Sequence, residues 1–339
     1  MPIRIGVIGT SDIAKRRMIP AIKKCKEFEY AGVAIAGQKE WNIFDLKSNG
    51  VYNLESKIQK AKGFEDLFGG ETYLSYNALL DDSSIDAVYI PLPPALHFYW
   101  AQKALDKGKH VLLEKPLTVS LQETKTLIDI ASNNNLALTE NYGFVYHSQF
   151  EKLQQLFKDG KIGSLRLIRA TFGFPHRAQN DFRYSKELGG GALLDCGGYV
   201  IKAACCFMNS PKIVASSLTV TPEHEVDIYG NITLQDKDLV AQLSFGMDNS
   251  YKCDFELWGS TGALISTRAY TAPDNFDSSI ILSNKDGKEE ISCGKDDQFE
   301  KTLIHFSNCI KDSAAKENEI KSILKQEELL FQVLSTLSK

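Results

Sequence analysis

A lysine followed by a proline, in Glu114-Lys115-Pro116, stands at the end of a short apolar strand, residues 110–114. Another apolar strand, residues 86–90, runs into Pro91-Leu92-Pro93, and a helical stretch separates the two strands. Strands joined in this way are parallel, with a right-handed crossover between them. Because ligands bind at the carboxyl ends of such strands, both loops are predicted at a binding edge. There the Lys115 ammonium group could meet a substrate carbonyl.

A turn between a strand and a helix opens the chain. Residues 3–8 form the strand, Gly9-Thr10-Ser11-Asp12-Ile13-Ala14 the turn, and a helix follows to about residue 24. Dinucleotide-binding proteins carry G-x-G-x-x-G/A here, and Ser11 takes the place of the middle glycine. A plain strand–turn–helix would look similar, but the N–H groups of a helix start can bind phosphate. The residues predicted to bind a cofactor here are Gly9, Thr10, Ser11, Asp12 and Ile13.

The end of the second strand, residues 30–36, decides between NADP and NAD. An acidic residue there would bind the ribose hydroxyls of NAD. Glu29 lies at the wrong end of this strand, and the correct end reads Gly37-Gln38-Lys39, with no acid before Glu40. Lys39 could face a 2′-phosphate, although a solvated loop charge is the alternative. We therefore expect Gln38 and Lys39 at the cofactor, with NADP favoured over NAD.

The order of elements predicts two domains, as a length of 339 residues favours. Strands and helices alternate over residues 1–145, which predicts an α/β fold with a doubly wound parallel sheet. Residues 146–339 are predicted to form a second α/β domain. Its strand-like runs, mostly without intervening helices, predict a large, mostly antiparallel open sheet. These runs are residues 165–172, 213–220, 229–234, 239–245, 254–258, 263–266 and 279–283.

Four helices complete the prediction for the second domain. One precedes the strands at residues 150–157, one interrupts them at about residues 198–208, and the others are residues 298–312 and 320–337. The last segment, about residues 320–339, is expected to pack back on the first domain.

Composition argues against several classes of function. A net charge of −4 gives no general attraction for nucleic acid or anionic membranes. No apolar run approaches the roughly 20 residues that span a bilayer, and a strand from Ile3 leaves no room for a signal peptide. The seven cysteines, without a CxxC motif, indicate reduced thiols in a cytoplasmic protein. We expect no metal, because no His, Cys, Asp or Glu cluster has ligand spacing.

Three stretches resemble one family when they are taken together. They are the turn over residues 9–14, GKHVLLEKPL at residues 108–117, and GGGALLDCGGY at residues 189–199. In this order they resemble the Gfo/Idh/MocA family of NAD(P)-dependent oxidoreductases, over nearly the whole chain. The resemblance implies a Rossmann domain followed by an α/β domain on a large open sheet. It also implies a homodimer or homotetramer formed through that sheet.

The resemblance also assigns catalytic residues. The lysine of the family's E-K-P motif lies beside nicotinamide and substrate, and its position is Lys115, with a peptide to Pro116 that is commonly cis. The family's D-x-x-x-H or D-x-x-x-Y motif is Asp195-x-x-x-Tyr199 here, and this spacing puts both residues on one helical face. Because a nearby ammonium group makes tyrosine a better acid, we expect Tyr199 to donate the proton. Lys115 is then its electrostatic partner or an alternative donor.

Other candidate residues keep an alternative. Asp195 could orient Lys115 or help to bind substrate, or it only caps its helix. His97 could contact the nicotinamide ribose or cap a helix. His147 could reach the substrate or pack in the core, and Arg183 is a candidate for a sugar or phosphate contact. The remaining residues expected near the cofactor are Pro91, Leu92, Pro93 and Glu114.

Two further stretches are TSDIAKRRMIPA at residues 10–21 and RAYTAP at residues 268–273. They resemble the nucleotide-diphosphate-sugar 3-ketoreductases of deoxysugar pathways. The chain departs from that branch at Gly37-Gln38, where Ser-Arg is usual, and at Tyr146-His147-Ser148-Gln149. The leading hypothesis is reduction of a 3-keto group on a sugar or nucleotide-linked sugar. The alternatives are a dehydrogenase of free aldoses or trans-dihydrodiols, and an NAD(P)-binding regulator without catalysis.

Overall fold

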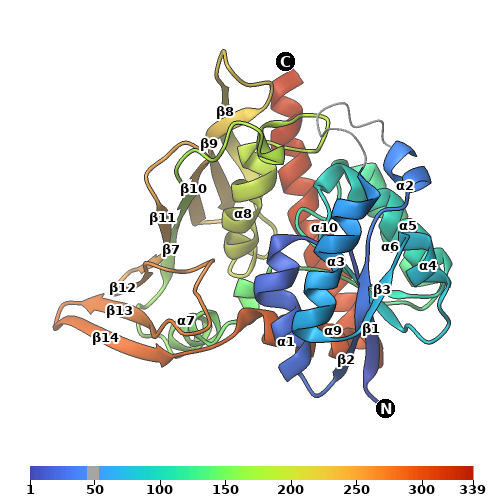
Figure 1. Cartoon of the computed structure of the whole chain (residues 1–339). Helices are drawn as coiled ribbons and strands as arrows, with labels where there is room; N and C mark the ends of the chain where they lie inside the picture. Colours follow the sequence, from blue (N-terminus) through green and yellow to red (C-terminus); the bar gives the residue numbers. More distant parts are fainter. Residues whose placement is uncertain (44–52, 339) are drawn as a thin grey trace. The chain divides into compact units, whose positions relative to one another are not determined.

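The computed structural model describes residues 1–43 and 53–338, which form two compact units (Figure 1). The first unit is Met1–Asn141 with Phe299–Lys321, and the second is Tyr142–Gln298 with Ser322–Lys339. The first boundary therefore falls slightly before the expected residue 145. The segment that returns to the first unit is also earlier than the predicted residues 320–339.

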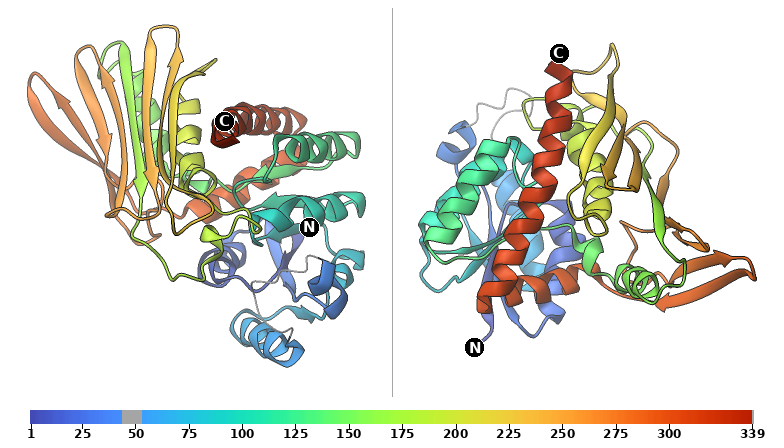
Figure 2. Two further views of the ribbon diagram at one scale, coloured as in Figure 1. Left: turned by 90° about the horizontal axis from the view of Figure 1, so that it is seen from above. Right: turned by 180° about the vertical axis from the view of Figure 1, so that it is seen from behind.

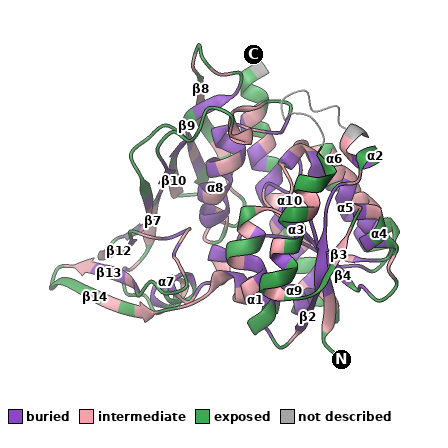
Figure 3. Cartoon of the chain, in the orientation of Figure 1, coloured by how far each residue is buried: buried purple, intermediate pink, exposed green. Residues whose placement is uncertain are grey.

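A sheet of parallel strands forms the centre of the first unit. Within the described residues its strand order is β3-β2-β1-β4-β5-β6, so the order reverses between β1 and β4. The strands are β1 (Ile3–Ile8), β2 (Phe28–Ala34), β3 (Glu71–Tyr73), β4 (Ala87–Ile90), β5 (His110–Leu113) and β6 (Leu138–Glu140). Their Val, Ile and Leu residues are mostly buried, as in a sheet covered on both faces (Figure 3). The doubly wound parallel sheet is confirmed.

Helices follow most strands of this unit. They are α1 (Ile19–Lys24), α2 (Gln38–Ile43), α3 (Leu54–Phe68), α4 (Tyr76–Asp81), α5 (His97–Asp106) and α6 (Leu121–Asn133). The start of α6 shows how local sequence fixes an element. Ser120 Oγ accepts a hydrogen bond of 3.2 Å from Glu123 N, and Leu127 and Ile128 one turn later are buried.

Two C-terminal helices, α9 (Gln298–Lys311) and α10 (Ser313–Leu334), complete the chain. The Phe306 ring of α9 stacks on the Phe28 ring of β2 at 5.8 Å, which explains why this segment belongs to the first unit. The helix expected from residue 320 begins seven residues earlier, at Ser313. Asp312 caps it, because its carboxylate accepts hydrogen bonds from Ala314 N and Ala315 N.

The second unit contains a large, mostly antiparallel sheet, seen from above in Figure 2. Within the described residues its order is β14-β13-β12-β11-β7-β10-β9-β8, and only the pair β7–β10 is parallel. The strands are β7 (Leu165–Gly173), β8 (Lys212–Val220), β9 (Asp227–Asp236), β10 (Leu239–Gly246), β11 (Lys252–Gly259), β12 (Gly262–Ser266), β13 (Ser278–Asn284) and β14 (Gly287–Gly294). The prediction missed β14, whose residues Lys288, Glu289 and Glu290 are all exposed and give no apolar pattern.

The two faces of this sheet differ. The helices α7 (Ser148–Lys158) and α8 (Gly198–Cys205) contact its strands and share a core with them. Along β11, Phe255 and Leu257 are buried, whereas Trp258 on the opposite face is 47% exposed.

No helix within the described residues is both long and apolar enough to cross a membrane.

Candidate active site

The glycine turn after β1 needs a glycine at its first position. Gly9 has φ of +99°, and its N–H donates a hydrogen bond of 2.9 Å to the Ala34 carbonyl. A Cβ atom at this position would lie 2.8 Å from Leu92 Cδ2. Any larger residue would therefore meet both backbone strain and a clash with the loop of Pro91-Leu92-Pro93.

The helix after this turn starts with a π-helical turn, Ala14–Met18, before α1. Ser11 Oγ accepts a hydrogen bond of 3.2 Å from Ala14 N, so its hydroxyl hydrogen can still be donated elsewhere. The Asp12 carboxylate accepts a bond of 2.7 Å from Arg16 Nε. Ser11 thus keeps the predicted capacity to donate to a phosphate, while Asp12 lies in an exposed ion pair.

The loop after β2 contains one acidic residue, and its carboxylate is already occupied. Glu40 Oε2 accepts hydrogen bonds from Gly37 N at 2.8 Å and Tyr76 N at 2.9 Å. Its Oε1 accepts from the backbone and side-chain nitrogens of Asn77. Gln38 and Lys39, the first two residues of α2 and the neighbours of this bonded carboxylate, are exposed. The arrangement leaves no Glu40 carboxylate for ribose hydroxyls, and it fits a 2′-phosphate near Lys39 better.

The Lys115 loop is held at its first residue by polar side chains. Glu114 Oε1 accepts hydrogen bonds of 2.6 Å from both Tyr89 Oη and Asn141 Nδ2. Its other oxygen, Oε2, lies 3.3 Å from Lys115 N. The peptide between Lys115 and Pro116 is cis, as the resemblance implied. Glu114 therefore fixes the start of the loop from the ends of β4 and β6.

His97, at the start of α5, is completely buried, and both ring nitrogens face carbonyl oxygens. Nδ1 lies 2.8 Å from Pro116 O and Nε2 lies 2.8 Å from Leu92 O. Burial lowers the pKa of His97, although the two carbonyl groups oppose that effect. His97 thus lies between the loop of Pro91-Leu92-Pro93 and the Lys115 loop, and its neutral ring donates one N–H to one of the two carbonyls. A contact between its ring and a cofactor stays a prediction.

In the second unit, the segment after the triple glycine forms a π-helical turn, Leu193–Gly197, that leads into α8. Asp227 Oδ2 accepts a hydrogen bond of 2.7 Å from Leu193 N and so caps this turn. Gly191, with φ of +124°, lets the two segments approach, because a Cβ there would lie 2.5 Å from Asp227 Oδ1. Burial raises the pKa of Asp227 to about 6. Sequence reasoning missed this residue, since nothing near it in the chain signals a cap.

Asp195 and Arg183 are brought together. Arg183 Nε donates a hydrogen bond of 2.9 Å to Asp195 Oδ2, and its Nη1 donates one of 3.1 Å to Asp181 Oδ1. Burial alone would lower the pKa of Arg183, but the two carboxylates outweigh it and raise the pKa. The capping role considered for Asp195 falls to Asp227, and the carboxylate of Asp195 instead holds a guanidinium group.

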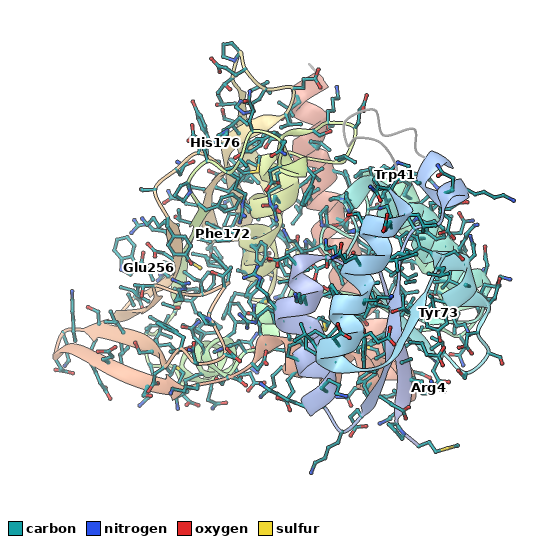
Figure 4. All side chains as sticks on the ribbon, in the orientation of Figure 1. Arg4, Trp41, Tyr73, Phe172, His176 and Glu256 are labelled. Atoms are coloured by element: carbon teal, nitrogen blue, oxygen red, sulfur yellow. The ribbon has the colours of Figure 1, made fainter. Side chains whose placement is uncertain are left out.

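The ring of Tyr199 is enclosed by aromatic rings from three other segments. Centroid distances are 5.0 Å to Phe172 of β7, which Figure 4 labels, and 5.1 Å to Tyr142. Phe144 lies at 5.8 Å and Tyr270 at 6.0 Å. These four residues are buried, whereas Tyr199 itself keeps intermediate exposure. The enclosure fixes the plane of the ring, and sequence reasoning did not identify it.

His147 caps α7 through its side chain. Its Nδ1 accepts a hydrogen bond of 3.1 Å from Gln149 N, and the ring is 1% exposed. This supports the packing alternative, and a substrate contact stays a prediction.

The predicted site residues form two sets, one in each unit. The first set is Gly9, Thr10, Ser11, Asp12, Ile13, Gln38, Lys39, Pro91, Leu92, Pro93, His97, Glu114 and Lys115, and the second is His147, Arg183, Asp195 and Tyr199.

A doubly wound parallel sheet with a glycine turn after its first strand is typical of Rossmann dinucleotide-binding domains. Residues 3–142 match the model of the GFO_IDH_MocA oxidoreductase family with an NAD-binding Rossmann fold. Residues 150–265 match the GFO/IDH/MocA C-terminal domain. The chain belongs to the Gfo/Idh/MocA family, as its motifs implied.

Individual relatives are similar over most of their length. A dTDP-3,4-didehydro-2,6-dideoxy-alpha-D-glucose 3-reductase of Saccharopolyspora spinosa is 38% identical over 312 residues, 91% of this chain and 88% of the relative. The crystal structure of KijD10, a 3-ketoreductase from Actinomadura kijaniata in complex with NADP and TDP-benzene, superposes with a TM-score of 0.88 at 34% identity. That alignment covers 99% of this chain and 98% of the other. A D-xylose 1-dehydrogenase (NADP(+)) of Haloferax volcanii is 34% identical over 66% of this chain and 62% of its own length.

Proposed function

We propose that the protein uses NADPH to reduce the 3-keto group of a nucleotide-linked sugar. The observation that carries the proposal is the likeness to dTDP-sugar 3-reductases over about nine tenths of the chain, 91% in two of them. At the coarser level the protein is an NAD(P)-dependent oxidoreductase of sugar metabolism. Membership in an oxidoreductase family argues for an enzyme over a regulator that only binds the nucleotide.

NADP is the cofactor, and the first unit offers residues that fit it. The residues that would hold the diphosphate are those of the Gly9 turn, where the positive φ and the close Leu92 side chain leave no room for a Cβ. Lys39 would meet the 2′-phosphate, because Glu40 is already bonded to four donors. When bound, NADPH supplies the hydride for the reduction.

The chain's own residues handle the proton and the developing charge. Hydride addition turns the ketone oxygen into an alkoxide, which needs a proton donor and nearby positive charge. Tyr199 donates its Oη proton to this oxygen, and the aromatic enclosure keeps its ring in one plane. Lys115 supplies the positive charge that favours the resulting phenolate and acts as the alternative donor.

The second unit also supplies a substrate-binding guanidinium. Arg183 contacts the sugar or the diphosphate, and Asp195 and Asp181 hold it in one orientation through three short contacts. Because two carboxylates flank one guanidinium, the three ionised side chains of Asp181, Arg183 and Asp195 together carry a net charge of −1. This charge favours hydrogen bonds to sugar hydroxyls over a purely electrostatic phosphate contact.

Turnover tests this proposal. NADPH oxidation is followed with dTDP-linked 3-keto sugars and with the corresponding free 3-keto sugars, and NADP reduction is followed with xylose. Tyr199→Phe and Lys115→Ala should each lower kcat about 10²- to 10⁴-fold while NADPH binding persists. Lys107→Ala, an exposed lysine paired with Asp81, serves as the control and should leave kcat unchanged. Turnover of xylose alone would reject the nucleotide-sugar substrate and favour the free-aldose alternative, which the Haloferax relative supports.

We also propose that the protein is a homo-oligomer that associates through the outer face of its large sheet. That face carries Val214, Tyr229 and Trp258, each at least 45% exposed. Apolar side chains gathered on one sheet face are typical of an interface. Sedimentation should give a dimer or tetramer, and Trp258→Lys should shift it toward the monomer.

A cytoplasmic location is part of the same proposal. All seven cysteines lie within the described residues, and none of them forms a disulfide. Thiols persist in this state in a reducing compartment. Fractionation of cells that express the protein should place its activity in the cytoplasmic extract.

A further inference from the structure

The peptide group that follows Pro116 is bonded at both of its polar ends by buried side chains. His97 Nδ1 lies 2.8 Å from the carbonyl oxygen of Pro116. Glu140 Oε1 accepts a hydrogen bond of 2.9 Å from the N–H of Leu117. His97 is 0% exposed, Glu140 1% and Leu117 0%, so water does not compete for these bonds. One planar peptide group is therefore fixed from two directions.

The two side chains come from elements that are themselves anchored. His97 is held by its place in the first turn of α5, and the clamp assigns the one N–H of its neutral ring to Nδ1, which faces Pro116 O. Glu140 ends β6, and its backbone N–H donates to Glu319 Oε1 at 3.3 Å. His305 of α9 bonds the other carboxylate oxygen of Glu319 at 3.1 Å. The bonds to the peptide group thus extend from the start of α5 to the C-terminal helices.

We propose that His97 and Glu140 are positioning residues that clamp the Pro116–Leu117 peptide group and thereby fix the place of Lys115. Glu114 anchors the residue before Lys115, and the clamp anchors the peptide group after Pro116. Lys115 and the cis peptide to Pro116 are thus the only backbone between two anchored points. This inference rests on the proposed role of Lys115 in the reaction and adds two residues to it.

A function-independent measurement tests the clamp itself. Hydrogen exchange is measured on a peptide covering residues 114–120 in the wild type, His97→Phe and Glu140→Leu. Each variant removes one bond, so the Leu117 amide should exchange at least about tenfold faster in both. Glu140→Gln keeps an Oε1 acceptor and should retain protection. Unchanged protection of the Leu117 amide in both His97→Phe and Glu140→Leu would overturn the proposal.

A double-mutant cycle with Lys115 tests whether the clamp acts through that residue. His97→Phe and Glu140→Leu should each lower kcat per NADPH-binding site about 10- to 100-fold. In the Lys115→Ala background the same changes should cost less than about threefold, because the group that they position is gone. Glu140→Gln should stay within about threefold of wild type. Equal losses in both backgrounds would mean a general structural role and would overturn the proposal.

A change at a second histidine serves as the control for His97→Phe. It distinguishes loss of the positioning bond from loss of an imidazole ring in general. His110 begins β5, the strand that ends just before Glu114 and the Lys115 loop. Its Nδ1 accepts a hydrogen bond of 3.0 Å from Ala137 N. His110→Phe should lower stability without changing kcat per binding site. If His97→Phe does not fold, His97→Gln retains one donor and should give a smaller loss in the same cycle.

The two proposals can fail separately. If the wild type reduces no nucleotide sugar, the proposed substrate is wrong, but the exchange experiment still decides whether the clamp exists. If the wild type is active and Lys115→Ala is equally active, the proposed role of Lys115 is wrong, and a kcat loss in His97→Phe would then be structural.

Discussion

The backbone beside Lys115 is held by hydrogen bonds from buried polar side chains, whereas the ring of Tyr199 is enclosed by other rings. Lys115 lies in a loop, so the buried peptide groups next to it need partners from outside regular secondary structure. Tyr199 belongs to α8, whose own backbone bonds fix its position. Only two side-chain torsions of Tyr199 remain, and ring packing can set both. Local secondary structure thus decides which means of support a residue needs.

Removal of one enclosing ring should have the largest effect. Phe172→Ala takes away the ring closest to Tyr199 and leaves a cavity in the core of the second unit. We expect a loss of about 3–5 kcal/mol in the free energy of unfolding, together with a lower kcat per folded molecule. Urea unfolding and kinetics on the same samples measure both quantities.

Phe64→Ala is the control for that change, because Phe64 is 2% exposed in the core of the first unit. It should cost a similar amount of stability and leave kcat per folded molecule unaltered. If both variants lose kcat equally, the enclosure of Tyr199 has no special part in activity.

The polar support in the first unit should depend on pH. Burial alone would lower the pKa of His305, but its bonds to Cys309 and Glu319 raise it to about 9. Because this pKa is above the unfolded value of about 6.5, its stabilising contribution is complete below pH 6.5 and disappears as the pH rises through 9. Wild type should exceed His305→Gln by roughly 2–3 kcal/mol at pH 6 and by little at pH 10. Urea unfolding at both pH values measures this difference.

The contrast with the aromatic support makes that experiment informative. Phe172→Ala should lose the same stability at pH 6 and pH 10, since no titratable group is removed. A His305→Gln difference that stays constant with pH would show that the pKa of His305 is the same in the folded and the unfolded protein.

The smallest effect is expected at a polar support of the Tyr199 helix, the cap formed by Asp227. Asp227→Ala removes the cap of Leu193 N and should cost about 1–2 kcal/mol. Asp227→Asn keeps an acceptor. Because burial raises the pKa of Asp227 to about 6, the folded protein binds more protons than the unfolded chain between about pH 4 and 6. Wild type should therefore lose stability relative to Asp227→Asn as the pH rises over that range.

Denaturation of the three proteins at pH 4.5 and 7 measures this effect. If Asp227→Ala is as stable as Asp227→Asn at both pH values, the hydrogen bond to Leu193 contributes nothing.

The elements that sequence reasoning found are those with local signals. Apolar runs located β1, β4 and β5, and a Ser120 cap with buried Leu127 located α6. The polar strand β14 has no such pattern, so it could not be found. Resemblance to a family, rather than periodicity, pointed to the cis peptide before Pro116.

The supporting residues of the site could not be found from local sequence, because their partners are distant in the chain. Glu40 binds Tyr76 N 36 residues away, and Asp227 binds Leu193 N 34 residues away. Glu140 is 23 residues from Leu117. An acidic side chain in a loop or strand looks the same whether it faces solvent or a buried peptide group, so only the folded structure distinguishes the two.

Helix α9 and the first part of α10 belong to the first unit, and this has a consequence for biosynthesis. The core of that unit includes Phe299, Leu303 and Phe306, which are translated long after Asn141. A ribosome must add a further 180 residues, 321 minus 141, before Lys321 completes the unit. At about 5–20 residues per second this takes roughly 10–40 seconds. During that interval the nascent chain exposes Phe28 and its apolar neighbours, so the nucleotide-binding half of this enzyme matures only after the second half has been synthesised.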